Sequence, residues 1–113
     1  MDQIQVTVTF PGISDLNEFK RLLEPAFDLA GDEPGTVQYD GFFSQDGTEA
    51  VFRETYVDSD AVLAHLQNVG HLLGPLGEAG GGVELEIFGN PSADLEAALS
   101  NMSPKIHPFH RGK

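Results

Sequence analysis

The sequence predicts an α+β fold, namely a ferredoxin-like βαββαβ sandwich with an antiparallel four-stranded sheet. Four stretches alternate apolar and polar residues with the period of two that is typical of half-buried strands. An apolar stripe with helical spacing follows the first and the third of these stretches. The pair Asp46-Gly47 separates the second stretch from the third, which is a strong hairpin signal. A chain of 113 residues has room for one such domain.

The first strand is predicted over residues 3–10, and Pro11-Gly12 ends it. Asp15 then has the position of a helix N-cap, with Glu18 three residues later to complete a capping box. The apolar stripe of this helix consists of Leu16, Phe19, Leu23, Ala26, Phe27 and Ala30. We expect Pro25 to kink or split the helix, because proline lacks a backbone N–H. Residues 31–35 are predicted to form a turn.

The second and third strands are predicted over residues 36–44 and 49–56, joined by the hairpin. Asp58 or Ser59 is expected to cap the second helix. Its buried stripe at 100° per residue consists of Val62, His65, Leu66, Val69, Leu72, Leu73 and Leu76. Gly70 and the pair Gly74-Pro75 are expected to break this helix into two pieces.

The fourth strand is predicted over residues 83–88, and Asn90-Pro91 is expected to open a short third helix. We assign residues 1–100 to one domain and residues 101–113 to a mobile C-terminal tail.

Composition excludes several classes of function. The net charge of −12 comes from 18 acidic and 6 basic residues, and such a surface repels nucleic acids and anionic lipid. The chain has no cysteine, so it has neither a disulfide nor a thiolate ligand. Its first residues lack a basic leader region, and no apolar run is long enough to span a membrane. We therefore expect a cytoplasmic protein.

The predicted helices cover only one face of the sheet. The other face mixes neutral polar residues with aromatic and β-branched ones, namely Gln3, Gln5, Thr7, Thr9, Gln38, Phe42, Val51, Arg53, Thr55 and Phe88. This surface is too apolar to remain fully in water. We expect a homodimer that buries this face against the same face of a second copy.

The chain resembles the antibiotic biosynthesis monooxygenase-like family of dimeric α/β barrels over residues 3–100. Three segments carry the resemblance: residues 34–36 (PGT), 54–58 (ETYVD) and 61–66 (AVLAHL). The family includes cofactor-free oxygenases that turn polycyclic phenols into quinones, haem-degrading enzymes and isomerases. The chain has no tryptophan, whereas the haem degraders and the best-studied quinone-forming oxygenases resemble each other in using one. This departure argues against haem degradation and puts quinone formation in doubt.

His65 is the foremost catalytic candidate, because it lies on the buried stripe near a strand that contains Glu54 and Tyr56. Its imidazole could take a proton from a bound phenol or quinol, whose anion would then react with O2 without metal or flavin. The alternative is a core histidine that hydrogen-bonds to Glu54 or to a tyrosine.

Glu54 is predicted on the helix-facing side of its strand, so its charge must be paired or its pKa raised. It is a candidate to orient His65, or else it pairs with Lys20, Arg21 or the Arg53 of a neighbouring subunit. The candidate substrate-binding residues are Tyr39, Tyr56, Phe43, Phe52 and His71. The alternative for these tyrosines and phenylalanines is that they are residues of the hydrophobic core.

No metal site is expected, because His65 and His71 lie about 240° apart on a regular helix. Only a break at Gly70 would redirect His71. The leading hypothesis is a homodimeric enzyme that resembles cofactor-independent monooxygenases and acts on a small aromatic or quinol substrate. The alternatives are a non-catalytic barrel that binds an apolar metabolite, and an isomerase that acts on a lactone-like substrate.

Overall fold

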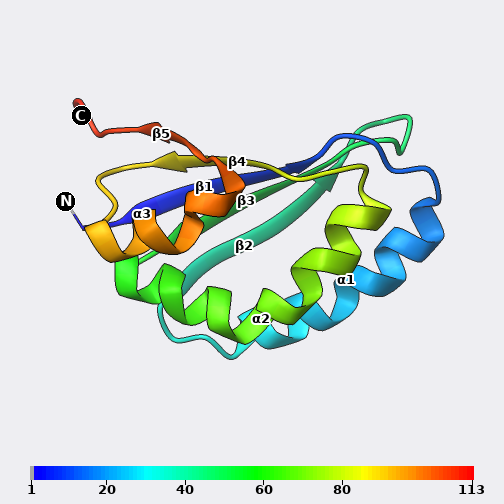
Figure 1. Ribbon diagram of the computed structural model, residues 1–113, viewed down its shortest axis with the longest axis horizontal. Coiled ribbons are helices and arrows are strands. Elements are labelled where there is room, and N and C mark those ends of the chain that lie inside the picture. Colours follow the sequence, from blue (N-terminus) through cyan, green and yellow to red (C-terminus); the bar gives the residue numbers. More distant parts are fainter. Residues whose placement is uncertain (1) are drawn as a thin grey trace.

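A computed structural model describes residues 2–113 and shows one sheet with helices on a single face (Figure 1). The elements in chain order are β1 (Ile4–Phe10), α1 (Leu16–Gly31), β2 (Thr36–Phe43), β3 (Ala50–Tyr56), α2 (Ser59–Ala79), β4 (Glu84–Phe88), α3 (Ala93–Leu99), the 3₁₀ helix η1 (Ser100–Met102) and β5 (Lys105–His107). The strand order across the sheet is β2-β3-β1-β4-β5. The predicted ferredoxin-like βαββαβ order is therefore confirmed.

The register of the sheet sets which side chains face the helices. β1 pairs antiparallel with β3, so that Val6 lies opposite Glu54, and it pairs antiparallel with β4 on its other side. β2 pairs antiparallel with β3, and Tyr39 also lies opposite Glu54. Side chains opposite one another in neighbouring strands share a face. Val6, Glu54 and Tyr39 thus meet on the face that the helices cover.

The prediction of four strands is wrong, because β5 adds a fifth. β5 lies in the segment 101–113 that the sequence pattern assigns to a mobile tail, and it pairs parallel with β4. Three contacts fix this pairing: the Gly89 amide donates to the carbonyl of His107, His107 Nε2 lies 3.0 Å from Glu86 Oε2, and the His107 ring stacks on Phe88. A strand of three residues is too short to show alternation, which is why the pattern does not reveal it.

Both long helices continue through their prolines. α1 is one helix through Pro25, and α2 is one helix through Gly70, Gly74 and Pro75, so the predicted breaks do not occur. Pro25 and Pro75 are exposed to solvent, where water can satisfy the carbonyl that loses its helical partner. Figure 1 shows that α2 instead changes direction partway along its length.

The helix caps agree only in part with the sequence pattern. Asp15 caps α1 by accepting a hydrogen bond from the Glu18 amide, and Asp58 caps α2 in the same way. The Glu18 carboxylate pairs with Arg21 instead of reaching back to the Asp15 amide, so the predicted capping box is only half formed. α3 begins at Ala93 with Ser92 as its cap, two residues later than predicted, because the Ser92 hydroxyl accepts from the Leu95 amide.

The core lies between the sheet and the helices in two clusters. One joins β1, β4 and α3 around Ile4, Ile87 and Leu95, and the other joins β1, β3 and α1 around Phe19 and Phe52. The opposite face of the sheet is uncovered, with Phe42 53% and Phe88 37% exposed. Among residues 2–113, no helix is long and apolar enough to cross a membrane.

Candidate functional site

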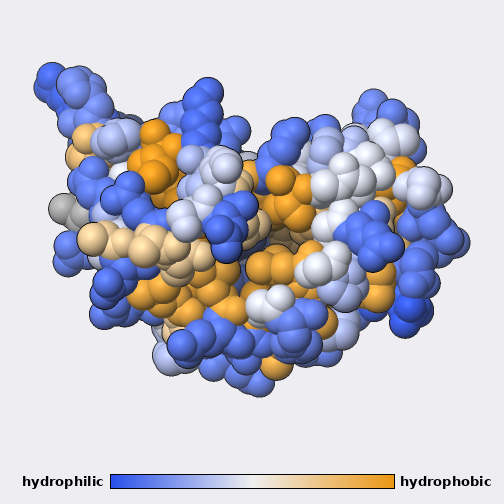
Figure 2. Space-filling model, in the orientation of Figure 1, coloured by the Kyte–Doolittle hydropathy of each residue, from blue (hydrophilic) through white to orange (hydrophobic). Residues whose placement is uncertain are grey.

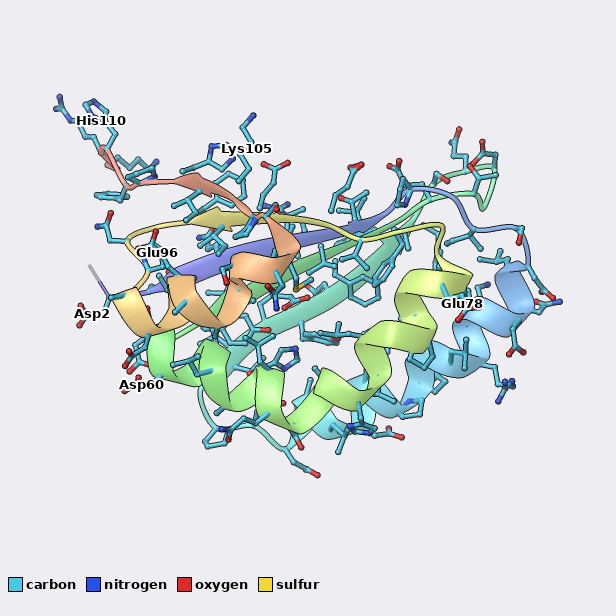
Figure 3. The ribbon with its side chains drawn as sticks, viewed as in Figure 1. Asp2, Asp60, Glu78, Glu96, Lys105 and His110 are labelled. Carbon is cyan, nitrogen blue, oxygen red and sulfur yellow. The ribbon has the colours of Figure 1, made fainter. Side chains whose placement is uncertain are left out.

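A small pocket lies between the two core clusters, under α2 and above the middle of the sheet. Its volume is about 50 Å³, and apolar side chains from β1, β3, β4, α1, α2, α3 and η1 form most of its wall. The polar side chains in the wall are those of Tyr39, Glu54, Tyr56 and His65. Figure 2 shows hydrophobic residues gathered around a hollow on this side of the molecule. In Figure 3, side chains of the sheet and of α2 project into the same space, whereas Asp60 and Glu78 point outward.

His65 is held from behind by Glu33, in the connection between α1 and β2. His65 Nδ1 lies 2.7 Å from Glu33 Oε1, and the histidine side chain is 7% exposed. A carboxylate only accepts hydrogen bonds, so Nδ1 carries the hydrogen that it donates to Glu33. In the neutral ring, Nε2 is then the atom with a free lone pair. The side chain that carries this nitrogen lines the pocket, and Nε2 lies 3.9 Å from Glu54 Oε1.

Glu33 is ionised because its hydrogen bonds outweigh its burial. Burial tends to raise the pKa of Glu33, but donors from Asn68, Thr36 and His65 together lower it below its usual value. Asn68 Nδ2 donates to Oε2 at 2.8 Å, and the Thr36 hydroxyl donates to Oε1 at 2.7 Å. Asn68 also donates to the carbonyl of Leu29, at 3.3 Å. The charged carboxylate thereby fixes both the tautomer and the orientation of the imidazole.

Gly35 lets the connection that carries Glu33 approach α2. A Cβ atom on Gly35 would lie only 2.5 Å from the Cβ of Ala61, well inside van der Waals contact. The Gly35 carbonyl also accepts a hydrogen bond from the Val57 amide at 3.0 Å. The absence of a side chain at this position is what brings Glu33 within hydrogen-bonding distance of His65.

Glu54 approaches the other side of the imidazole and is in a different electrostatic state. It is 5% exposed, and its Oε1 lies 3.9 Å from His65 Nε2. Burial raises the pKa of Glu54 to about 7, a hydrogen bond from the Tyr56 hydroxyl opposes the rise, and the charge of Glu33 reinforces it. A raised pKa is one of the two alternatives predicted for this carboxyl group. The chain's own Arg21 pairs with Glu18 instead.

The two tyrosines flank the imidazole as uncharged hydrogen-bond donors. The rings of Tyr39 and Tyr56 lie 5.2 Å and 5.4 Å from the ring of His65, centroid to centroid. Burial and the charges of nearby carboxylates raise the pKa of both phenols, so both stay protonated at neutral pH. Tyr56 donates its hydrogen to Glu54. The Tyr39 hydroxyl has no such bond among the described residues.

Three polar atoms of the pocket wall therefore have unused hydrogen-bonding capacity: His65 Nε2, the second oxygen of Glu54 and the hydroxyl of Tyr39. Among residues 2–113, no side-chain nitrogen or oxygen is both fully covered and without a partner. These three atoms therefore keep some contact with open space, and the side chains that carry them all line the pocket. An acceptor and two potential donors thus converge on one small apolar cavity.

The structure brings five of the seven predicted site residues together, because His65, Glu54, Tyr39, Tyr56 and Phe52 all line the pocket. The other two lie apart from it. Phe43 packs edge-on against Phe19 at the far end of β2, and Lys20 lies over its ring. His71 is exposed on α2, because the helix stays regular through Gly70.

Sequence reasoning missed Glu33, which takes the orienting role that the sequence pattern offered to Glu54. Glu33 lies in a turn without periodicity, so its burial could not be inferred. One signal was present: His65 and Asn68 are three residues apart and share a helix face, so a polar partner was required beside them. The described residues contain no group of three His, Cys, Asp or Glu that could hold a metal ion.

Comparisons with known proteins bear on the fold. No family model matches the sequence, and no curated protein matches it. The structure is similar to the crystal structure of MupZ from Pseudomonas fluorescens, with a TM-score of 0.83 and 24% identity over 100% of this chain and 94% of that one. It is also similar to SnoaB, a cofactor-independent oxygenase from Streptomyces nogalater, with a TM-score of 0.64 and 20% identity over 82% of this chain and 97% of that one.

A third similar structure is a proposed antibiotic biosynthesis monooxygenase from Caulobacter crescentus, with a TM-score of 0.66 and 22% identity over 76% of this chain and 87% of that one. At identities of 24% or less, these similarities show a shared fold and not a shared reaction. The chain therefore has the α+β fold of the antibiotic biosynthesis monooxygenase-like proteins, as its sequence motifs indicate.

Proposed function

We propose that the protein is a cofactor-independent oxygenase that acts on a small aromatic or quinol substrate. The observation that carries this proposal is the ionised Glu33 behind His65, which leaves Nε2 as a free base at an apolar pocket. A histidine held in one tautomer by a carboxylate is a common arrangement for a general base. The similarity of fold to a cofactor-independent oxygenase supports the choice of reaction.

In this reaction His65 takes the proton of the substrate hydroxyl, and the substrate anion gives electrons to O2. One oxygen atom becomes a carbonyl group at a ring carbon ortho or para to the hydroxyl, and the other leaves as water with the hydrogens of that C–H and of the O–H, so that a phenol and O2 become a quinone and H2O. The substrate is itself the reductant, so the balance needs no other electron donor. Tyr39 is the substrate anchor in this scheme, since its hydroxyl is free to bond a substrate oxygen.

The size of the pocket limits the substrate. A dry apolar cavity that binds benzene has a volume of about 150 Å³, whereas this one has a volume of about 50 Å³. An aromatic ring therefore enters only if the flexible side chains of the wall move or if part of the ring stays in the open mouth. Met102 and Leu73 are only partly buried and form part of that wall, and unbranched methionine adapts readily to a ligand.

The test is the rate of O2 uptake with a panel of quinols and anthrone-type phenols. We expect His65→Ala to lower the rate by about 10²-fold or more, the usual contribution of a positioned base. The matched control is His71→Ala, because this histidine is exposed on the same helix and does not line the pocket. Equal rates for wild type and His65→Ala would remove His65 from the mechanism.

The second candidate function is binding of an apolar metabolite without turnover. The mostly apolar wall of the pocket favours it, since such a wall binds a ligand even if no proton moves. Binding without reaction predicts ligand-dependent stabilisation and no consumption of O2. Isomerisation of a lactone-like substrate would need the same base and would also consume no oxygen, but it would yield a product.

A further inference from the structure

We propose that Glu54 acts as a neutral carboxylic acid that donates a hydrogen bond to the substrate oxygen from which His65 removes the proton. The pocket would then accept neutral hydroxy compounds and reject carboxylates of the same size. This inference builds on the proposed role of His65 as the base. It assigns Glu54 the opposite state from Glu33 and gives it direct contact with the substrate.

Two carboxyl groups, those of Glu33 and Glu54, lie on opposite sides of the His65 imidazole, and their hydrogen bonding differs. Glu33 lies 2.7 Å from Nδ1 and accepts from three side chains, so it is well supplied with donors. Glu54 lies 3.9 Å from Nε2, which is too far for a direct hydrogen bond, and among the described residues it accepts a hydrogen bond only from Tyr56. A buried carboxylate that accepts a single hydrogen bond is poorly stabilised in an apolar pocket. The neutral acid carries no charge, so burial costs it much less free energy.

The charges around Glu54 also favour its neutral form. The groups that face it are Tyr56 on its own strand, Tyr39 on β2, His65 on α2 and, behind the imidazole, Glu33. None of these is a permanent cation, and within residues 2–113 no lysine or arginine lines the pocket. With Glu33 ionised, a second negative charge in the same space would be repelled. The raised pKa of Glu54 agrees with this expectation.

The three free atoms of the wall match the needs of one hydroxyl group. His65 Nε2 accepts the proton, which breaks the substrate O–H bond and forms an N–H bond. The resulting oxyanion accepts hydrogen bonds from the Tyr39 hydroxyl and from the second oxygen of Glu54, which carries the acid hydrogen. Donors aimed at a developing oxyanion in a site that excludes water are strongly stabilising. A substrate carboxylate would instead bring a full negative charge into a wall without lysine or arginine among the described residues, with the charge of Glu33 just behind the imidazole.

The first experiment measures binding of two small probes by NMR, following the ring signals of His65. We expect phenol to shift these signals in a saturable way and benzoate to leave them unchanged at equal concentration. Phenol binding should weaken as the pH rises through about 7, because ionised Glu54 no longer donates.

Two variants separate the donor from the charge. Glu54→Gln keeps a donor that cannot ionise, so the weakening of phenol binding as the pH rises through about 7 should be lost. Glu54→Leu removes the donor, and we expect its affinity for phenol to be about tenfold lower than that of Glu54→Gln. Benzoate binding as tight as that of phenol would overturn the inference, as would a complete absence of phenol binding.

A third measurement does not depend on any variant folding or on any ligand. The carboxyl carbons of ¹³C-labelled glutamate report protonation directly, and we expect one buried signal to titrate near pH 7 in the wild-type protein. If every glutamate is ionised at pH 6, Glu54 is not a donor. None of these experiments requires turnover, so a failure to consume O2 would refute the proposed oxygenase without deciding the state of Glu54.

Discussion

His65 lies between two glutamates whose environments differ although their residue type is the same. Glu33 combines 10% side-chain exposure with three donors, and its pKa is lowered. Glu54 combines deeper burial with one donor, and burial raises its pKa to about 7. The count of donors therefore decides which carboxyl group carries the charge. An imidazole flanked in this way can exchange a proton on one side while its other side stays fixed.

The state of Glu54 makes the stability of the protein depend on pH. Its pKa rises from 4.5 to about 7 on folding, so the folded state holds this proton more tightly. The stabilising contribution is complete below pH 4.5 and is lost as the pH rises through about 7. At about 1.4 kcal/mol per pH unit, the loss is on the order of 3 kcal/mol.

Urea unfolding at a series of pH values between about 5 and 8 tests this prediction. Glu54→Gln should flatten the decline in the free energy of unfolding, because an amide does not titrate. Glu24→Gln, which replaces an exposed carboxylate on α1, should leave the decline as it is in wild type. Parallel curves for wild type and Glu54→Gln would show that Glu54 is ionised throughout.

Among individual residues, the sequence pattern predicted the pocket residues that lie on strands and helices. It missed Glu33, which lies in the connection between α1 and β2. Alternation along β3 predicted that Glu54 and Tyr56 share the helix-facing side, and helical spacing predicted that His65 faces the same space. Glu33 could not be found in that way, since its position depends on how the connection between α1 and β2 folds back on α2. Periodicity carries no information about such a contact.

At the scale of elements, the contact between the α1–β2 connection and α2 sets the site. Gly35 touches Ala61 so closely that a methyl group has no room. This contact positions the two partners of the hydrogen bond. Glu33 lies two residues before Gly35, and His65 lies four residues after Ala61 on α2. A change that separates the two segments should therefore move Glu33 away from Nδ1.

Gly35→Ala is predicted to destabilise the protein by about 1–3 kcal/mol, the usual effect of overpacking. Adding Ala61→Gly should restore part of the loss, despite a cost of about 1 kcal/mol for glycine in a helix. Gly70→Ala is the matched control: apart from the adjoining backbone of α2 itself, none of the described atoms lies within 4 Å of the added methyl group, so it should stabilise α2 by about 0.5–1 kcal/mol. Chemical denaturation measures all of these variants, and equal stability for Gly35→Ala and wild type would contradict the prediction.

The helices show where local propensity was a poor guide. Gly74 and Pro75 predicted a break in α2, yet burial of Val69 and Leu76 on either side holds the helix together. Tertiary packing of an apolar stripe outweighs the propensity of one or two exposed residues. The regular continuation also explains why His71 points away from the pocket, since only a break would have redirected it.

At the scale of the whole molecule, the main open question is the uncovered face of the sheet. The helices of the single chain lie on the other face. Phe42, Val51 and Phe88 lie on this face among neutral polar side chains, and Arg53 is exposed there. A second copy related by a two-fold axis would cover these residues with their own counterparts. We therefore propose a homodimer through this face, as expected from the sequence.

Analytical ultracentrifugation tests the proposed dimer. Val51→Glu places a charge in the middle of the face and should shift the protein to monomers at micromolar concentration, because burying an unpaired charge is costly. Val57→Glu makes the same replacement at an exposed site after β3, outside the sheet face, and should leave the dimer intact. A wild-type protein that sediments as a monomer would rule out this association.

The short β5 strand has a consequence for how molecules of this kind can assemble into larger polymers. Among residues 2–113, β5 covers the outer backbone groups of β4 and, with three residues, offers only a short edge to an added strand, so that β2 is the longer edge at which a fibre could grow. There the register shift between Thr36 and Gln38 interrupts the regular ladder that an incoming strand would need. The final segment of the chain thus protects the sheet from uncontrolled extension, although its sequence shows no strand pattern.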